Sequence, residues 1–126
     1  MEPKYFEVIT EYDFQSDILY ISNTIDYRYN ESIEMGNNLI LDFNENDRPV
    51  ALEILDASKF LKVKKYSLQH IKHVRLELLI DEDIISIKGS FIVLMHNKEV
   101  AKPFVGETIN DINLPFMNTN FGMAEA

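Results

Sequence analysis

The sequence contains no cysteine and no tryptophan, and only four glycines and four prolines among 126 residues. The lack of cysteine excludes disulfide bonds, thiolate metal ligands and a cysteine nucleophile. The few glycines form neither a Gly-x-Gly-x-x-Gly nor a Walker pattern, so no glycine-rich cradle for nucleotide phosphates is present. A serine nucleophile would lack the Gly-x-Ser-x-Gly elbow that exposes it. We therefore expect no catalytic residues, no cofactor and no enzymatic activity.

Positive charge is also scarce, because 12 Lys and Arg face 21 Asp and Glu, for a formal net charge of −9. Residues 1–62 hold thirteen acidic and five basic residues, giving −8, and residues 63–126 hold eight and seven, giving −1. Such a surface repels phosphate backbones and anionic lipids, so neither nucleic acid nor a membrane is an expected partner. No apolar run reaches the roughly 20 residues of a membrane span. We expect a cytoplasmic protein, and the simplest role of the acidic surface is solubility.

Short runs of β-branched and aromatic residues, separated by turn residues, predict a mainly β (α+β) fold of antiparallel meanders. We expect one domain, 1–126, with seven to nine short strands. Residues 5–61 form a first meander and a short helix at 57–61, which Asp56 caps. Residues 62–105 form a second meander, preceded by a short helix near 68–73 that Ser67 caps, with turns that include Gly89-Ser90. Residues 106–126 show no period and are expected to form an ordered, irregular tail.

The segment from Tyr12 to Ser58 carries several short motifs. It opens with Tyr12-Asp13 and with Asp17 before Leu19-Tyr20-Ile21, continues with Leu39–Asp42, and closes with Glu53-Ile54-Leu55-Asp56-Ala57-Ser58. In these motifs it resembles a small prokaryotic family catalogued as domain of unknown function 2283. The resemblance implies a compact antiparallel β fold without an assigned activity, and an association with gene pairs that resemble toxin–antitoxin modules. Asp47 and Ala51 stand where the family has glycine.

The weak metal candidates are Asp42, Asn44, Asn46 and Glu53, which occupy positions 1, 3, 5 and 12 of a calcium-loop template. The sixth position of that template requires Gly but holds Asp47, and the flanks favour strands instead of helices. An Asx-rich hairpin turn explains the same residues. More broadly, Asp13, Asp17, Asp42, Glu53 and Asp56 could converge on a ligand or ion, or could each serve a separate turn, strand or cap.

Histidine offers a further arrangement, since His70 and His73 would lie on one face of the second helix. Zinc would need another ligand, and His96 is the only histidine left. A solvated helix face beside Lys72 explains the pair without a metal, and the sequence favours this interpretation.

The function that this sequence favours is a non-enzymatic protein–protein interaction or self-associating β module, with a homodimer as the simplest form. Its partner-binding candidates are Tyr27, Tyr29, Phe116 and Phe121, because exposed aromatic rings often anchor a partner. An acidic antitoxin-like partner of a basic protein is one variant. The alternative from a different class is a small-ligand or metal-binding domain with a carboxylate-lined site.

Overall fold

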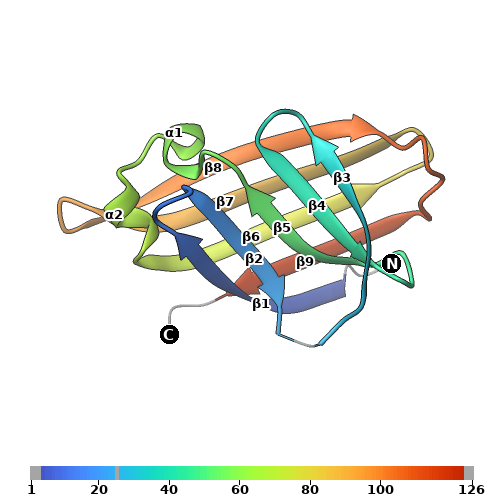
Figure 1. The fold of residues 1–126 in the computed structure, drawn as a ribbon, viewed down its shortest axis with the longest axis horizontal. Helices are drawn as coiled ribbons and strands as arrows, with labels where there is room; N and C mark the ends of the chain where they lie inside the picture. The colour runs from blue at the N-terminus through green and yellow to red at the C-terminus, as the bar shows by residue number, and fades with distance from the viewer. Residues whose placement is uncertain (1–3, 25, 124–126) are drawn as a thin grey trace.

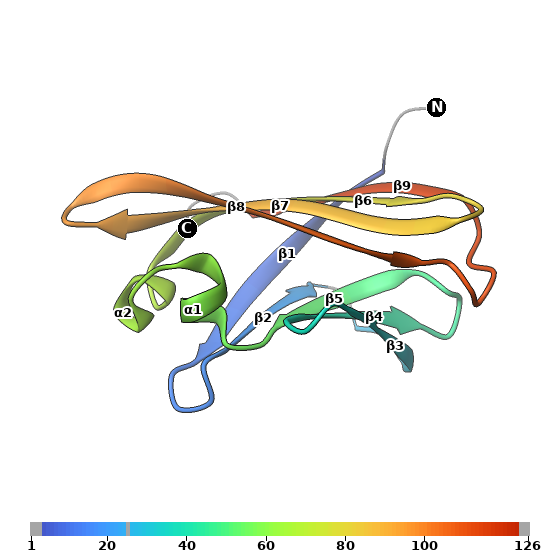
Figure 2. The same cartoon turned by 90° about the horizontal axis from the view of Figure 1, so that it is seen from above.

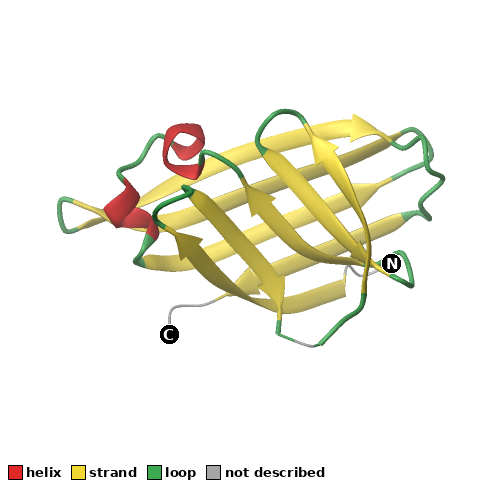
Figure 3. Ribbon diagram, viewed as in Figure 1, coloured by secondary structure: helices red, strands yellow, loops and turns green. Residues whose placement is uncertain are grey.

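The computed structural model describes residues 4–24 and 26–123, and strands dominate this part of the chain (Figure 3). The strands are β1 (Lys4–Asp13), β2 (Ile18–Asn23), β3 (Tyr29–Met35), β4 (Leu39–Asn44), β5 (Pro49–Ile54), β6 (Ile71–Ile80), β7 (Ile84–Met95), β8 (Lys98–Ile109) and β9 (Met117–Met123). Two short helices, α1 (Ala57–Leu61) and α2 (Lys65–Leu68), follow β5. The predicted mainly β fold is confirmed.

The strands form one nine-stranded sheet in the order β3-β4-β5-β2-β1-β9-β6-β7-β8. This sheet folds over into two layers whose strands cross (Figures 1 and 2). We call β2–β5 with residues 8–13 of β1 the N-terminal layer, and β6–β9 with residues 4–7 of β1 the C-terminal layer. The strand β1 joins them, because residues 4–7 pair in parallel with β9 and residues 8–13 pair antiparallel with β2. A strand that changes layers in this way is typical of orthogonally packed sheets.

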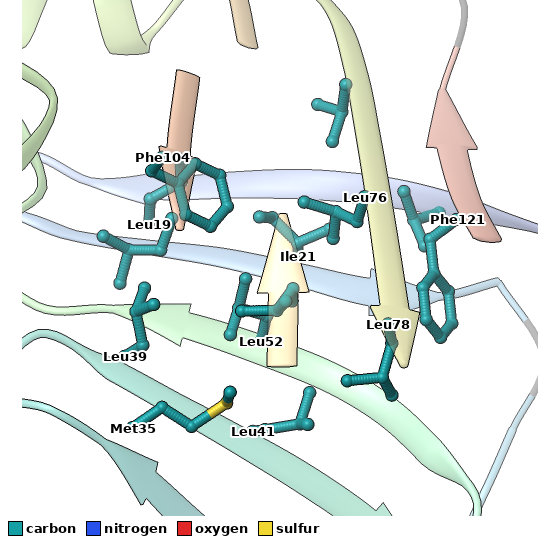
Figure 4. Packing of buried hydrophobic residues seen from close by; sticks show 14 of the residues in the cluster. Leu19, Ile21, Met35, Leu39, Leu41, Leu52, Leu76, Leu78, Phe104 and Phe121 are labelled. Carbon is teal, nitrogen blue, oxygen red and sulfur yellow. The ribbon is translucent and has the colours of Figure 1, made fainter. Parts of the chain in front are cut away.

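The core lies between the layers and follows directly from the alternation of apolar residues along the strands. In β6, for example, Leu76, Leu78 and Ile80 point inward and are at most 2% exposed. Side chains from both layers interdigitate there, as Figure 4 shows for Leu39, Leu41 and Leu52 facing Leu76, Leu78 and Phe121. Neither layer could bury its apolar face without the other.

The helices lie between the layers at one end of the molecule (Figure 2). Helix α1 spans residues 57–61, as predicted from the sequence, and it buries Ala57 and Leu61. The Phe60 ring packs edge-on against Phe104 of β8, with centroids 6.1 Å apart. The second helix spans Lys65–Leu68 and not 68–73, and Ser67 lies inside it and does not cap it. The Ser67 hydroxyl donates to the Leu94 carbonyl at 2.9 Å, so it ties α2 to β7.

The predicted turn at Gly89-Ser90 was wrong, because β7 runs without interruption through both residues. Gly89 on β7 pairs with Phe104 on β8. A Cβ atom at Gly89 would lie 2.3 Å from the Phe104 ring. The glycine is therefore required for the close approach of an aromatic ring inside the sheet.

The prediction of an irregular tail over 106–126 was wrong for residues 106–109 and 117–123, whereas residues 110–116 are irregular and residues 124–126 lie outside the described part of the chain. Strand β8 continues to Ile109, and Met117–Met123 form β9 between β1 and β6, near the middle of the sheet. The segment lacks an obvious strand pattern because Asn118, Asn120 and Gly122 alternate with Thr119, Phe121 and Met123. Its inward residues include a threonine, so hydrophobic periodicity alone does not reveal it.

Candidate functional site

Asp17 is the centre of a hydrogen-bond network that joins the β1–β2 turn to α1. The Ser58 backbone amide and hydroxyl donate to the two Asp17 carboxylate oxygens at 3.0 and 2.6 Å, and the Tyr12 hydroxyl donates at 2.6 Å. Burial opposes ionisation of Asp17, but the hydrogen bonds from Ser58 and Tyr12 outweigh it and lower the Asp17 pKa. Asp17 therefore caps the first turn of α1 from a distant part of the chain.

Asp56 does not provide the side-chain cap of α1 that the sequence predicted. It occupies the N-cap position of α1 but is in the left-handed conformation and makes no side-chain cap hydrogen bond. The presence of Tyr12, Asp17 and Ser58 in the family-like segment is thus explained by the hydrogen bonds that attach α1 to the β1–β2 turn. The Ser58 hydroxyl donates to a carboxylate, and no histidine takes part in these hydrogen bonds.

Asp42 and Glu53 form a carboxyl pair on the outer face of the N-terminal layer. They lie on adjacent strands, where Asp42 pairs with Ala51 and Glu53 pairs with Ile40. Burial, a hydrogen bond to Asp42 and the Asp42 charge raise the pKa of Glu53 to about 7. Glu53 therefore keeps its proton up to a pH near 7, beside the Asp42 side chain.

A serine hydroxyl contacts this carboxyl pair, and a tyrosine hydroxyl contacts that serine. The Ser32 hydroxyl donates to an Asp42 carboxylate oxygen at 2.5 Å and contacts the Tyr29 hydroxyl at 2.7 Å. Burial, followed by the charges of Asp42 and Glu53, raises the pKa of Tyr27, so its phenol stays neutral near pH 7. Within residues 4–24 and 26–123, no group of three or more His, Asp or Glu side chains is placed to hold a metal ion.

The remaining carboxylates do not join this pair. Asp13 accepts the backbone amides of Gln15 and Ser16 within its own turn, at 3.0 and 3.3 Å. Asp17 binds Ser58, as described above. The structure thus brings together two of the carboxylates considered from the sequence, and it uses Asp13 in a turn and Asp17 in a helix cap.

The β4–β5 turn contains the other weak metal candidates, Asn44 and Asn46. The Asn44 side-chain oxygen accepts the backbone amides of Asn46 and Arg48 at 2.9 and 3.0 Å. Asp47 supplies the left-handed residue of the turn, with a φ of 58°. This geometry is that of an Asx-type hairpin turn between two strands.

A cavity of about 430 Å³ lies beside this turn. Its lining includes Tyr27 from the β2–β3 connection, Arg48 from the β4–β5 turn, and Phe116 from the segment before β9. Asn44 and Asn46 also line it, so the cavity gathers two metal candidates and two partner-binding candidates. Sequence analysis missed Arg48, because its neighbours in the cavity come from segments far apart in the chain.

The other partner-binding candidates and the histidines are placed separately. Tyr29 is 60% exposed, at the start of edge strand β3, whereas Phe121 is 5% exposed and stacks on Phe6 in the core. Phe121 is therefore not accessible to a partner. His70 follows α2 and lies 4.9 Å from the Tyr66 ring, while His73 lies on β6, so the two histidines do not share a helix face.

The outer faces of the two layers differ in charge. On the N-terminal layer, cross-strand pairing aligns Glu11, Tyr20, Glu53, Ile40 and Glu34 in one row. The strand residues of this face carry acidic groups and no Lys or Arg. On the C-terminal layer, Glu77 pairs with Lys88, and Arg75 lies two residues before Glu77.

Exposed apolar residues gather on the C-terminal layer. Ile84 and Ile109 are directly paired across β7 and β8 and are 36% and 71% exposed. Leu79 pairs with Ser86, one step along β7 from Ile84 on the same face, and is 36% exposed. Val105 pairs with Lys88 and is 70% exposed, with Glu107 between it and Ile109 on the outer face of β8. These four residues alternate with the buried residues of their strands, so they face outward; we call them the apolar patch.

Comparison with known proteins confirms the resemblance found in the sequence. Residues 9–58 match the family described as "Protein of unknown function (DUF2283)". A protein from Methanosarcina mazei named "Putative hypoxanthine phosphoribosyltransferase" is 33% identical over 105 residues, which cover 83% of this chain and 84% of that protein. The chain belongs to the same family as this protein. An uncharacterised protein from Methanocaldococcus jannaschii is 30% identical over 111 residues, which cover 86% of this chain and 92% of that protein.

No solved structure matches this chain. The DUF2283 segment, residues 9–58, corresponds to nearly all of the N-terminal layer and the start of α1. Among the described residues, neither helix has the length and apolar character needed to span a membrane.

Proposed function

We propose that this protein is a non-enzymatic, self-associating β module in which the C-terminal layer of one copy packs on that of a second copy. The observation that carries the proposal is the apolar patch of Leu79, Ile84, Val105 and Ile109. Leu79, Ile84 and Ile109 adjoin on this face, and Val105 lies farther along β8. Exposed apolar residues that adjoin on one face are typical of protein interaction surfaces.

The charge of this face supports a second copy as its partner. A two-fold dimer brings the same surface of both copies together, so that surface must be complementary to itself. The C-terminal layer carries both signs there, as in the Glu77–Lys88 pair, whereas the N-terminal layer would place like charges against each other. Like charges in an interface cost several kcal/mol.

Sedimentation velocity of wild type and of Ile109→Lys tests this proposal. We expect a concentration-dependent dimer for wild type, and a monomer for the variant because two lysines would be buried at the two-fold interface. Ile9→Lys is the matched control, since Ile9 is 53% exposed on the other layer, and it should leave the dimer intact. A wild-type monomer at high micromolar concentration, or equal behaviour of both variants, would refute the proposal.

The acidic outer face of the N-terminal layer favours a second candidate function, the docking of a basic protein as in an antitoxin-like role. Complementary charge across an interface speeds association and makes it sensitive to salt. Gentle purification from the native host would then recover a basic polypeptide in fixed ratio, which dissociates as ionic strength rises. Recovery of this chain alone would argue against the second candidate.

The name of the Methanosarcina mazei relative suggests phosphoribosyl transfer to a purine base as an enzymatic alternative. Phosphate groups are commonly bound at the N-terminus of a helix that follows a glycine-rich loop. The described helices have 5 and 4 residues and follow no such loop. We therefore favour a binding role; incubation with hypoxanthine and phosphoribosyl pyrophosphate, with detection of the nucleotide product, tests the alternative directly.

A further inference from the structure

The two ends of the sandwich are closed to different degrees. The helices fill one end, between the layers, whereas the other end is formed by connections alone (Figures 1 and 2). The 430 Å³ cavity lies at this second end, where the β2–β3 connection, the β4–β5 turn and residues 115–119 meet. Its volume is in the range of sites for small molecules, which often lie at the mouth of a β-barrel or sandwich.

Aromatic rings form the accessible part of this cavity. Phe116 is 70% exposed and Tyr27 is 40% exposed, and they come from different layers. Phe6, Val50 and Met117 are the less exposed apolar residues of the lining. Two exposed rings beside an apolar interior offer flat surfaces on which a planar ligand can stack.

The polar lining consists mainly of side-chain amides. Asn23, Asn46 and Asn118 line the cavity, and none of their side chains makes a hydrogen bond to the described part of the chain. Each amide has a donor and an acceptor, so it can pair with the hydrogen-bonding edge of a heterocycle. These groups are consequently available to a ligand without loss of an existing bond.

The charged residues of the lining favour a neutral ligand over an anionic one. Asp26 and Asp47 face one cation, Arg48, so the lining carries a formal charge of −1. A phosphate or carboxylate would meet more negative than positive charge there, and the Asp42–Glu53 pair is close enough to Tyr27 to affect its ionisation. A ligand with a net negative charge is therefore disfavoured.

We propose that this cavity is a binding site for a small, neutral, planar heteroaromatic compound that stacks on Tyr27 and Phe116 and pairs with the amides around them. The site is separate from the apolar patch, because Leu79, Ile84, Val105 and Ile109 do not line it. Binding and self-association are thus independent properties of two surfaces.

Adenine tests the proposal as a neutral planar compound, and adenosine 5′-monophosphate is its anionic counterpart. We expect adenine to shift the amide resonances of residues around 27, 48 and 116 in a titration followed by two-dimensional NMR. The monophosphate should bind at least about fivefold more weakly, since its phosphate faces the two carboxylates. An Asp26→Asn, Asp47→Asn double variant should reduce the difference in affinity between adenine and the monophosphate.

Phe116→Ala is the decisive variant, because an exposed ring can be removed with little effect on folding. Stacking of one base on an aromatic ring contributes about 1–3 kcal/mol, so adenine affinity should fall at least about fivefold. Tyr66→Ala is the matched control, since Tyr66 is 67% exposed on α2 and does not line the cavity. Absence of shifts at millimolar adenine, shifts at another surface, or equal loss in both variants would overturn the proposal.

The variant that tests self-association separates the two proposals. Ile109→Lys should bind adenine as wild type does while it loses the dimer. If Ile109→Lys is monomeric and Phe116→Ala binds adenine normally, the cavity proposal fails and self-association stands. If wild type is a monomer that binds adenine at this cavity, self-association fails and the cavity proposal stands.

Discussion

The two layers of this protein share one core but differ in every other respect. The N-terminal layer contains nearly all of the DUF2283 segment, and the charged strand residues of its outer face are all acidic. The C-terminal layer lies outside that segment and carries both signs of charge together with the apolar patch. The comparison shows that the recognised family segment is half of a sandwich, and that its inner face must be covered by the other half.

This dependence is visible in the arrangement of β9. The last described strand pairs with β6 and with residues 4–7 of β1, the strand that joins the two layers. Its Phe121 stacks on Phe6, with ring centroids 5.8 Å apart. A change at this strand should therefore affect the N-terminal layer as much as the C-terminal layer.

The largest predicted effect is that of Phe121→Ala. Removal of this buried ring should destabilise the whole protein by about 3–5 kcal/mol, and both layers should unfold together. Chemical denaturation monitored by hydrogen exchange in each layer measures both quantities. Phe116→Ala, at a ring that is 70% exposed, is the control and should cost less than about 0.5 kcal/mol. If the amides of the N-terminal layer stayed protected in Phe121→Ala, the DUF2283 segment would be an autonomous folding unit, and the proposed dependence of the N-terminal layer on the C-terminal layer would be contradicted.

A smaller effect is expected from Asp17→Ala. This variant removes the acceptor of three hydrogen bonds, from Tyr12 and from the amide and hydroxyl of Ser58. We expect a loss of about 2 kcal/mol in the free energy of unfolding, and faster exchange of the amides at the start of α1. Asp13→Ala provides the comparison within the same turn, since Asp13 is exposed and accepts only local amides. Equal effects of the two variants would contradict the capping role.

The smallest effect concerns the pH dependence of the acidic face. The pKa of Glu53 is raised to about 7 in the folded protein from an ordinary value of 4.5. Because the folded state holds this proton more tightly, the stabilisation is complete below pH ~4.5 and is lost as the pH rises through ~7. We expect this pH-dependent stabilisation to be on the order of 1 kcal/mol after solvent screening. Glu53→Gln should remove it and so make the free energy of unfolding depend less on pH.

The matched control is Glu34→Gln, at an exposed position on the same face. Thermal unfolding of both variants between pH 4.5 and 8 gives the measurement. An unchanged slope in Glu53→Gln would show that the carboxyl pair does not control the pH response of the N-terminal layer.

Much of the local structure was predictable from the sequence. The alternation in β6 identifies its inward residues. Asn44 and Asp47 identify the β4–β5 turn, because the Asn44 side chain accepts backbone amides and Asp47 tolerates the left-handed conformation. The start of α1 was predicted correctly at residue 57, although the predicted cap interaction was wrong. Asp56 lies next to the helix, but Asp17, 41 residues before Ser58, supplies the acceptor.

What the sequence determined by itself was therefore the mainly β class, most strands and turns, and the scarcity of basic residues. These depend on neighbours in the chain, through backbone conformation and the two-residue period of a strand. Only the tertiary structure decided that Gly89 lies inside a strand beneath Phe104, that Phe121 belongs to a central strand, and that Tyr27, Arg48 and Phe116 line one cavity. Each of these depends on contacts between distant segments, which local periodicity does not encode.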